Sequence, residues 1–301
     1  MQRLDSCSSS LLSYDWFFSR FPDQRSCCNF LFQSRLGNDW PCPRCGRQTK
    51  WHLSRYYYYG CQRCGYQLRP KAGTIFARSK IDLQRWFFVA LLMCQSPRSV
   101  PAQFVKRATG LGEQAAWSLG DRLRSHMEWL GQPRLLGGPG KVIEVDETFL
   151  PNVVRSERAR IKVLGITDRS QVMTFITKDR KRETIWPILR KFVAPGSIVN
   201  TDGWKAYRGL EALGFEHRFV NHLKGEWVGK DGTSTLFIDG YWARLKHFLS
   251  RTHVRINEAH IGKYIKEYEL RFNHRNDRTA MFFRVIGEHP EFPAYTGRTL
   301  G

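Results

Sequence analysis

Residues 141–146 read KVIEVD and residues 197–202 read SIVNTD, and these two stretches decide the fold. Each is a short apolar run, typical of a buried strand, that ends in an aspartate, Asp146 in the first and Asp202 in the second. Carboxylates at the carboxyl ends of adjacent strands point into one crevice of an open sheet. Taken singly, an aspartate at a strand end is more often a turn former or a cap. As a pair, the two predict a divalent-cation site for Mg²⁺ or Mn²⁺, which prefer hard oxygen ligands.

The elements around these stretches follow a definite order. Periodicity predicts strands at 141–146, 161–167, 172–177, 197–201 and 215–220, and helices at 182–192, 204–213, 238–250 and 258–274. Three consecutive strands, then alternating helices and strands, then helices are the order of an RNase H-like α/β domain. We therefore expect a mixed sheet flanked by helices.

Further candidate site residues follow in the second half of the chain. Asp239 opens the 238–250 helix and is a third possible metal ligand, and Lys246, seven residues on, lies on the same helix face and could hold a phosphate. Alternatively, Asp239 caps the start of the helix and Lys246 is a solvated surface lysine. His222 could position substrate or transfer a proton, or be structural. Glu144 and Glu147 are secondary candidates; strand alternation puts Glu144 on the side of Asp146 and Glu147 on the other.

Four of the eight cysteines form two C-x-x-C pairs with 15 residues between them, namely Cys42, Cys45, Cys61 and Cys64. Two such turns deliver four thiolates to one tetrahedral Zn²⁺, and a closed four-ligand site is structural rather than catalytic. Gly46 and Gly65 follow the two pairs, where a knuckle favours a permissive backbone. Basic residues and the tyrosine run 56–59 surround the pairs and suit DNA contact; a solvated basic face is the alternative.

The first half of the chain is otherwise predicted to be helical. The run 81–95 is almost wholly apolar and predicts a buried helix. Helices at 100–108 and 113–130, separated by a glycine-containing break, have the outline of a helix-turn-helix, although any helical hairpin has the same outline. The expected domains are an N-terminal helical segment (1–39), a β zinc ribbon (40–78), a small helix-turn-helix-like domain (79–136), the RNase H-like domain (141–275) and a C-terminal tail (276–301).

Charge is the dominant feature of the composition. The chain carries 48 Lys and Arg against 27 Asp and Glu, a net charge of +21, and both halves are basic. This favours a nucleic-acid partner over an anionic membrane surface. The longest apolar run, Trp86 to Cys94, is about half of what a bilayer requires, and the N-terminus does not read as a secretory signal. We expect a cytoplasmic, nucleoid-associated protein.

Several motifs in combination resemble a known family. The cysteine pairs followed by Ala72-Gly73-Thr74-Ile75-Phe76 are similar to the front end of bacterial insertion-sequence transposases of the Merlin-related, ISXO2-like group. The rest of the family pattern resembles the stretches 144–148, 200–207, 221–222, 238–246 and 267–273. The resemblance implies a DDE-type site in which Asp146 and Asp202 match the first two acids and Lys246 matches the lysine after the third. Asp239 stands where a glutamate is expected, and is one methylene shorter.

The resemblance implies an enzyme that binds terminal inverted repeats in double-stranded DNA, cleaves a phosphodiester with two metal ions and joins the freed end to target DNA. Pairing two element ends suggests a homodimer or higher oligomer. A catalytically weakened or inactive relic that acts as a zinc-ribbon DNA-binding protein is the alternative from another class. A nuclease of the same fold that does not join ends is a third reading, which shared metal chemistry leaves open.

Overall fold

The structure is a computed structural model that describes residues 12–37, 40–150, 161–252 and 256–290. The chain divides into two compact units, one made of residues 1–126 and 276–301 and the other of residues 127–275. The first 11 and last 11 residues of the chain, which belong to the expected N-terminal segment and C-terminal tail, lie outside the described residues, as does Cys7.

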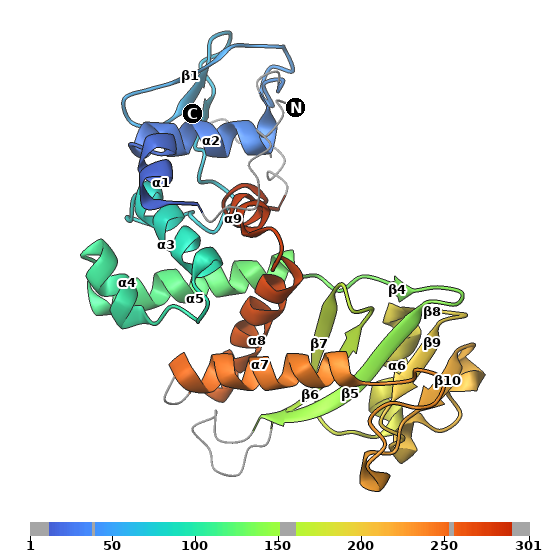
Figure 1. The fold of residues 1–301 in the computed structure, drawn as a ribbon. Coiled ribbons are helices and arrows are strands. Elements are labelled where there is room, and N and C mark those ends of the chain that lie inside the picture. Colours follow the sequence, from blue (N-terminus) through green and yellow to red (C-terminus); the bar gives the residue numbers. More distant parts are fainter. Residues whose placement is uncertain (1–11, 38–39, 151–160, 253–255, 291–301) are drawn as a thin grey trace. The chain divides into compact units, whose positions relative to one another are not determined.

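The first unit consists of helices and a small antiparallel sheet that lies at one end, against one of the helices (Figure 1). Its helices are α1 (Tyr14–Arg20), α2 (Gln24–Leu36), α3 (Leu83–Gln95), α4 (Ala102–Thr109), most of α5 (Glu113–Leu130) and α9 (Arg278–Gly287). The sheet is formed by β1 (Trp51–Leu53), β2 (Tyr59–Cys61) and β3 (Gln67–Leu68) in the order β1-β2-β3. The helices expected at 81–95, 100–108 and 113–130 are confirmed to within two residues at each end.

Aromatic side chains form the core of this unit. Phe17 of α1 packs 5.5 Å from Phe88 of α3, and Phe21 packs 5.2 Å from Phe87, measured between ring centroids. Phe282 of α9 joins the same cluster, 6.3 Å from Phe21. Residues 276–301 were expected as a tail, but α9 packs against α3 because its apolar face, with Met281, Phe282, Val285 and Ile286, is buried. This helix was not predicted from the sequence.

The second unit is a five-stranded mixed sheet with helices on both faces (Figure 1). Its strands are β5 (Val142–Leu150), β6 (Ile161–Thr167), β7 (Val172–Thr177), β9 (Ile198–Thr201) and β10 (Glu216–Phe219), in the order β10-β9-β5-β6-β7. The pairs β5–β6 and β6–β7 are antiparallel, whereas β9 runs parallel to β5 and β10 parallel to β9. The short strands β4 (Leu136–Gly137) and β8 (Val193–Ala194) pair separately.

The two faces of β5 bury different side chains. Ile143 and Val145 point into the core under α6 (Arg182–Phe192), whereas Leu150 belongs to the core under α7 (Leu236–Thr252) and α8 (Glu258–Asn273). Alternation along β5 therefore places Glu144 and Asp146 on the α7 side and Glu147 on the α6 side, as predicted. This strand supplies acids to both faces of the sheet at one point.

One predicted helix is wrong. Residues 204–213 form two 3₁₀ helices, η1 (Lys205–Tyr207) and η2 (Leu210–Leu213), rather than one α-helix. Gly209 lies between them with φ +85°, a left-handed conformation that an α-helix cannot accommodate. A third 3₁₀ helix, η3 (His222–Lys224), follows β10.

Gly165 of β6 provides a test of the packing between the sheet and α7. It pairs with Asp146 across the strands, and a Cβ added to it would lie 2.5 Å from Cζ2 of Trp242 and 2.9 Å from Cδ1 of Ile238. We expect Gly165→Ala to lower the free energy of unfolding by about 1–3 kcal/mol, because α7 would have to move. Urea unfolding followed by tryptophan fluorescence measures this change.

Gly262 of α8 offers the matched control. A Cβ there would lie 3.5 Å from Cδ1 of Ile176, an ordinary contact, and alanine is the better helix former by about 1 kcal/mol. Gly262→Ala should therefore leave stability unchanged or raise it. Equal stability of Gly165→Ala and the wild type would show that α7 does not pack on β6 as described.

Candidate active site and zinc cluster

The acidic site is built on the parallel pairing of β5 with β9. The register sets Glu144 opposite Asn200, and two residues further along each strand it brings Asp146 level with Asp202, which follows the last residue of β9. The structure places one carboxylate oxygen each of Asp146, Glu147 and Asp202 within 4.8 Å of one another. Two of the predicted site residues therefore meet, and Glu147, a secondary candidate, joins them.

Each of the three carboxylates is held differently. Asp146 is 8% exposed, and its Oδ2 accepts a hydrogen bond of 2.9 Å from Nε1 of Trp242 on α7. Asp202 is partly exposed, and its Oδ1 accepts 2.9 Å from the backbone N–H of Trp204. The Glu147 side chain is 1% exposed, and neither of its oxygens has a hydrogen bond of standard geometry among the described residues, although the nearby Tyr207 hydroxyl lowers its pKa. An orphaned buried carboxylate of this kind calls for a positive partner.

Arg180 is the nearby cation, with its Nη2 3.8 Å from Oε2 of Glu147. Its guanidinium also lies over the rings of Trp204 and Phe149, at 4.7 Å and 5.3 Å from their centroids. Sequence reasoning missed Arg180, because nothing in the local pattern distinguishes it from the chain's other basic residues. The adjacency of Glu147 to Asp146 was the signal that could have raised Glu147 to a main candidate.

Asp239 lies close to this group but does not belong to the cluster of three. Its Oδ2 accepts a hydrogen bond of 3.1 Å from the Thr235 hydroxyl, whose oxygen lies 3.3 Å from Nε2 of His222. Burial raises the pKa of Asp239, and Asp202 raises it further, whereas Thr235, His222 and Lys246 lower it. The structure therefore places His222 and Lys246 within electrostatic reach of Asp239, with Lys246 exposed on α7.

Glu144 positions the helix that carries Asp239. It is fully buried, its Oε2 accepts 3.0 Å from the backbone N–H of Ile238, and its Oε1 accepts 2.9 Å from Nε of Arg169. A carboxylate bound to the first turn of a helix also interacts favourably with the helix dipole. Glu144 thus anchors the start of α7 rather than facing the acidic cluster.

Mutual repulsion dominates the electrostatics of the cluster. Burial, together with the charges of Glu147, Asp239 and Asp202, raises the pKa of Asp146 well above its usual range. Burial also raises the pKa of Glu147 to about 7, against the lowering effect of Arg180. Two oxygens on one Mg²⁺ ion lie at most about 4.2 Å apart, because each sits at 2.0–2.1 Å. A group no wider than 4.8 Å therefore fits a divalent cation after small side-chain movements.

The four cysteines of the first unit form a second cluster. Sγ atoms of Cys42, Cys45, Cys61 and Cys64 all lie within 4.8 Å of one another, and those of Cys42 and Cys64 are 3.7 Å apart. Thiolates at about 2.3 Å from a tetrahedral Zn²⁺ stand about 3.8 Å apart, so the spacing fits this ion.

The two cysteine-containing turns, 42–46 and 61–65, have the same backbone conformation. Gly46 N–H donates to the Cys42 carbonyl at 2.7 Å, and Gly65 N–H donates to the Cys61 carbonyl at 3.0 Å. Both glycines have positive φ, +67° and +71°, as a knuckle requires. The cluster is therefore compatible with zinc binding, as the spacing of the cysteines predicted.

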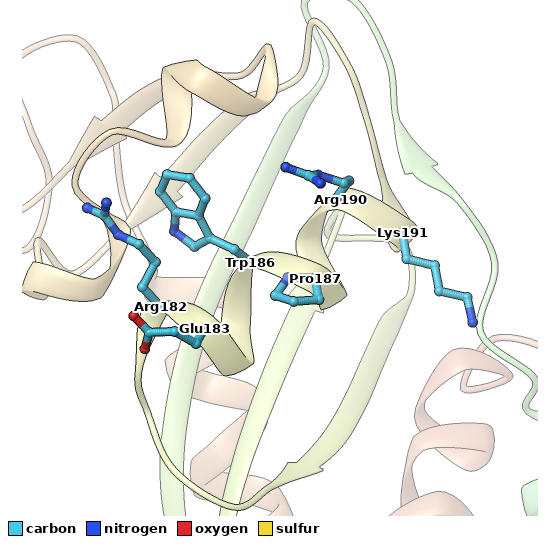
Figure 2. A pocket seen from close by; sticks show the side chains of 6 residues that line it. All are labelled: Arg182, Glu183, Trp186, Pro187, Arg190 and Lys191. Atoms are coloured by element: carbon cyan, nitrogen blue, oxygen red, sulfur yellow. The ribbon is translucent and has the colours of Figure 1, made fainter.

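A surface pocket of about 560 Å³ lies elsewhere in the second unit, over α6 (Figure 2). Side chains of that one helix line it, among them Arg182, Trp186 and Arg190, and none of them belongs to the acidic cluster. No helix among the described residues is both long and apolar enough to cross a membrane.

Glu147 makes stability depend on pH. Because its pKa in the folded protein is about 7 against an ordinary 4.5, its ionisation increasingly opposes folding as pH rises from 4.5 to 7, and the full cost applies above pH 7. At pH 8 without divalent cations, we expect Glu147→Gln to have a free energy of unfolding higher than that of the wild type by on the order of 3 kcal/mol, and therefore to unfold at a higher temperature. The difference should vanish near pH 4.

Thermal melts at both pH values measure this effect, and Glu183→Gln, an exposed glutamate of α6, is the control that should show no such dependence. Added Mn²⁺ should stabilise the wild type at pH 8 and so reduce the difference in melting temperature between it and Glu147→Gln. A Glu147→Gln protein less stable than the wild type at pH 8 would mean that the carboxylate is satisfied by the protein itself.

Comparison with known proteins identifies relatives of this chain. Residues 135–273 match the ISXO2-like transposase domain family. An uncharacterized transposase-like protein of Haemophilus influenzae is 30% identical over 105 residues, 35% of this chain and 83% of that protein. An uncharacterized protein in transposable element ISH50 of Halobacterium salinarum is 24% identical over 281 residues, 83% of this chain and 91% of that protein.

Among solved structures, a chain of the cryo-EM structure of the simian T-cell lymphotropic virus intasome in complex with PP2A regulatory subunit B56 gamma is 15% identical. It covers 52% of this chain and 60% of its own length, with a TM-score of 0.28, which is too low to support an argument. The residues matched by the family include Asp146, Asp202 and Asp239. The chain belongs to the ISXO2-like transposase family.

Proposed function

We propose that this transposase is a DDE-type enzyme that cuts DNA at the ends of a mobile element and joins them to target DNA. The observation that carries the proposal is the gathering of Asp146, Glu147 and Asp202 within 4.8 Å in a member of a transposase family. A chain that had lost its chemistry would have no reason to retain buried carboxylates that repel one another.

The second unit is, in this proposal, an RNase H-like catalytic domain of residues 141–275. Three antiparallel strands followed by two parallel ones, in the order β10-β9-β5-β6-β7, support the assignment. Asp202 follows the last residue of β9, at a strand end of the kind that open α/β sheets use for ligands. Asp146 lies level with it inside β5, which continues to Leu150 rather than ending at Asp146 as its pattern predicted. Asp239 enters the same region from α7.

Asp146, Asp202 and Asp239 would hold Mg²⁺ or Mn²⁺, with Glu147 beside them. Such ions, when bound, activate a water or a 3′-hydroxyl and neutralise charge at the phosphodiester. Trp242 orients Asp146 through its indole N–H, and Glu144 fixes the helix turn that carries Asp239. His222, linked to Asp239 through Thr235, is placed to position substrate or transfer a proton, and Lys246 to contact a phosphate.

The partner is, in this proposal, double-stranded DNA. It would comprise the terminal inverted repeats and the target, held by a homodimer or higher oligomer. The net charge of +21 supports a polyanionic partner. The zinc ribbon of residues 40–78 and the α4–α5 hairpin, with Gly110 in the left-handed conformation between them, would contribute to binding. The zinc ion would be structural, because four thiolates leave no open coordination position.

Removing either principal acid tests the chemistry. We expect Asp146→Ala and Asp202→Ala to lower Mg²⁺- or Mn²⁺-dependent cleavage and strand transfer of labelled element ends on the order of a thousandfold or more, because each loss removes a ligand oxygen. Binding of the same duplex, measured by mobility shift, should change little. Glu211→Ala, which removes an exposed acid of the same unit, should cleave normally.

Asp239 separates an active enzyme from a relic. Asp239→Glu lengthens the side chain by roughly 1.5 Å and should retain or increase cleavage, whereas Asp239→Asn should lose most of it. Wild-type cleavage by Asp239→Asn would remove Asp239 from the proposed site. Absence of cleavage in every variant and in the wild type, with duplex binding intact, would favour a non-catalytic DNA-binding protein.

The zinc assignment has its own test. We expect Cys42→Ser to lose the bound zinc measured by atomic absorption, to unfold the ribbon and to weaken duplex binding, because one of four ligands is removed. The rate of metal-dependent cleavage at saturating protein should be unchanged. Cys94→Ala, which alters a buried cysteine of α3 outside the cluster, should keep its zinc. Full zinc content in Cys42→Ser would contradict the ligand assignment.

A further inference from the structure

A groove of about 510 Å³ lies beside the zinc ribbon in the first unit. The turn 56–58 between β1 and β2 and the segment 69–79 line it, together with Gln24 and Cys28 of α2. Among its lining residues are three tyrosines and three cations and no acid: Tyr56, Tyr57, Tyr58, Arg69, Lys71 and Arg78. The groove is therefore aromatic on one side and positively charged on the other.

Two residues of this groove are held in a strained backbone conformation. Tyr57 has φ +61° and Arg78 has φ +57°, and among the described residues the only other non-glycine with positive φ is Arg169. The turn at Tyr57 is closed by Ser54, whose N–H donates to the Tyr58 carbonyl at 2.8 Å. Glycine would adopt these angles without the cost of about 1–2 kcal/mol that a side chain incurs. Strain retained at two points of one groove indicates a function for the two side chains.

These side chains are also available to a ligand. Tyr57 is 39% exposed, and within the part of the chain that the structure describes no ring or cation contacts its ring. Tyr56 is 62% exposed, with the Arg55 guanidinium 4.6 Å from its ring centroid. Arg78 is exposed, and its guanidinium has neither a hydrogen bond nor an ion pair to any described residue.

The remaining cations shape the groove instead. Lys71 donates to the carbonyls of Ser79 and Ile81 at 3.0 and 3.3 Å, which folds the segment that carries Arg78. Arg69 lies over the Tyr58 ring, 5.0 Å from its centroid, and donates to its hydroxyl at 3.4 Å. These contacts fix the walls, whereas the Tyr57 ring and the Arg78 guanidinium have no such contact with any described residue.

We propose that this groove binds unpaired nucleotides of single-stranded DNA, with a base stacked on Tyr57 and the adjacent phosphate held by Arg78. An aromatic face can stack only on a base whose own face is uncovered, and in a duplex neighbouring base pairs cover both faces. Duplex contact would need cations alone and would leave the strained tyrosine unexplained. The inference rests on the proposal that DNA is the partner, and adds that one segment of this DNA is bound as a single strand.

The pocket over α6 also contains an aromatic ring and cations, but it is less suited to stacking a base (Figure 2). Trp186 there is engaged by the protein, because its Nε1 donates 3.0 Å to the Ala206 carbonyl and the Arg182 guanidinium lies 4.5 Å from its ring centroid. Glu183 adds a negative charge to the lining. We therefore assign single-strand binding to the groove beside the ribbon.

Substitution of Tyr57 by glycine separates function from structure. The test is the binding of a fluorescently labelled oligothymidylate to the full zinc-loaded chain, followed by anisotropy without divalent cations. Tyr57→Gly should weaken binding about tenfold, since stacking contributes about 1–3 kcal/mol per base. Its melting temperature should stay the same or rise, because the backbone strain is relieved. Tyr57→Phe, which keeps the ring, should bind as the wild type does.

Two further variants complete the test. Tyr14→Ala removes a tyrosine that is 64% exposed on α1 outside the groove and should bind normally. Arg78→Gly should weaken binding and reduce its salt dependence, because one phosphate contact is lost. Wild-type affinity of Tyr57→Gly, or equally strong loss of blunt-duplex binding in that variant, would overturn the proposal.

Asp202→Ala, measured in both the binding assay and the cleavage assay, separates failure of the groove from failure of the catalytic proposal. Asp202→Ala should bind the oligothymidylate as tightly as the wild type, because the groove lies in the other unit. If Asp202→Ala has no cleavage defect but Tyr57→Gly loses single-strand binding, the catalytic proposal fails and the groove stands. If the reverse is found, the groove fails and the catalytic proposal stands.

Discussion

The parallel pairing of β9 with β5 is the constraint on which the second unit depends. That register brings Asp202 level with Asp146, although 55 residues separate them in the chain. Because β5 also pairs antiparallel with β6 on its other side, its acids are fixed in direction as well as in position. Asp146 faces α7 and Glu147 faces α6, yet their carboxylates converge near Asp202, where β9 has ended and no longer separates the two faces.

The rest of the unit serves to hold like charges together. Trp242 donates to Asp146, and Glu144 holds the first turn of α7, while Gly165 leaves the space that the Trp242 ring occupies. Among the described residues, Arg180 is the one cation that forms an ion pair with the cluster of three, at 3.8 Å from Glu147. Its single positive charge does not neutralise three carboxylates. Proton uptake, which the raised pKa values of Asp146 and Glu147 favour, or a divalent cation would relieve the repulsion, and the repulsion therefore supports the proposed metal site.

Much of this could be predicted from sequence, and the exceptions have physical causes. The helix 182–192 and the strands 161–167 and 172–177 were predicted with their observed bounds, because their apolar periodicity is strong. The helix predicted at 204–213 failed because a periodic pattern does not reveal that Gly209 adopts a left-handed conformation. The helix α9 was missed because its partners, α2 and α3, lie some 200 residues earlier. The site was foreseen at Asp146 and Asp202, but alternation alone placed Glu147 on the other face, and only the end of β9 lets it join them.

Both units give up stability at the places to which we assign function. In the second unit, burial raises the pKa values of Asp146 and Glu147, so their ionised forms oppose folding near neutral pH. In the first, Tyr57 and Arg78 occupy backbone conformations that glycine would adopt at less cost. The contacts of Trp242 with Asp146 and of Arg180 with Glu147 do not remove the first cost, because the pKa values of both carboxyls stay raised. A fold selected for stability alone would remove both with single substitutions, so their persistence is best explained by ligands that the protein binds: a cation at the carboxylates and a nucleotide at the tyrosine.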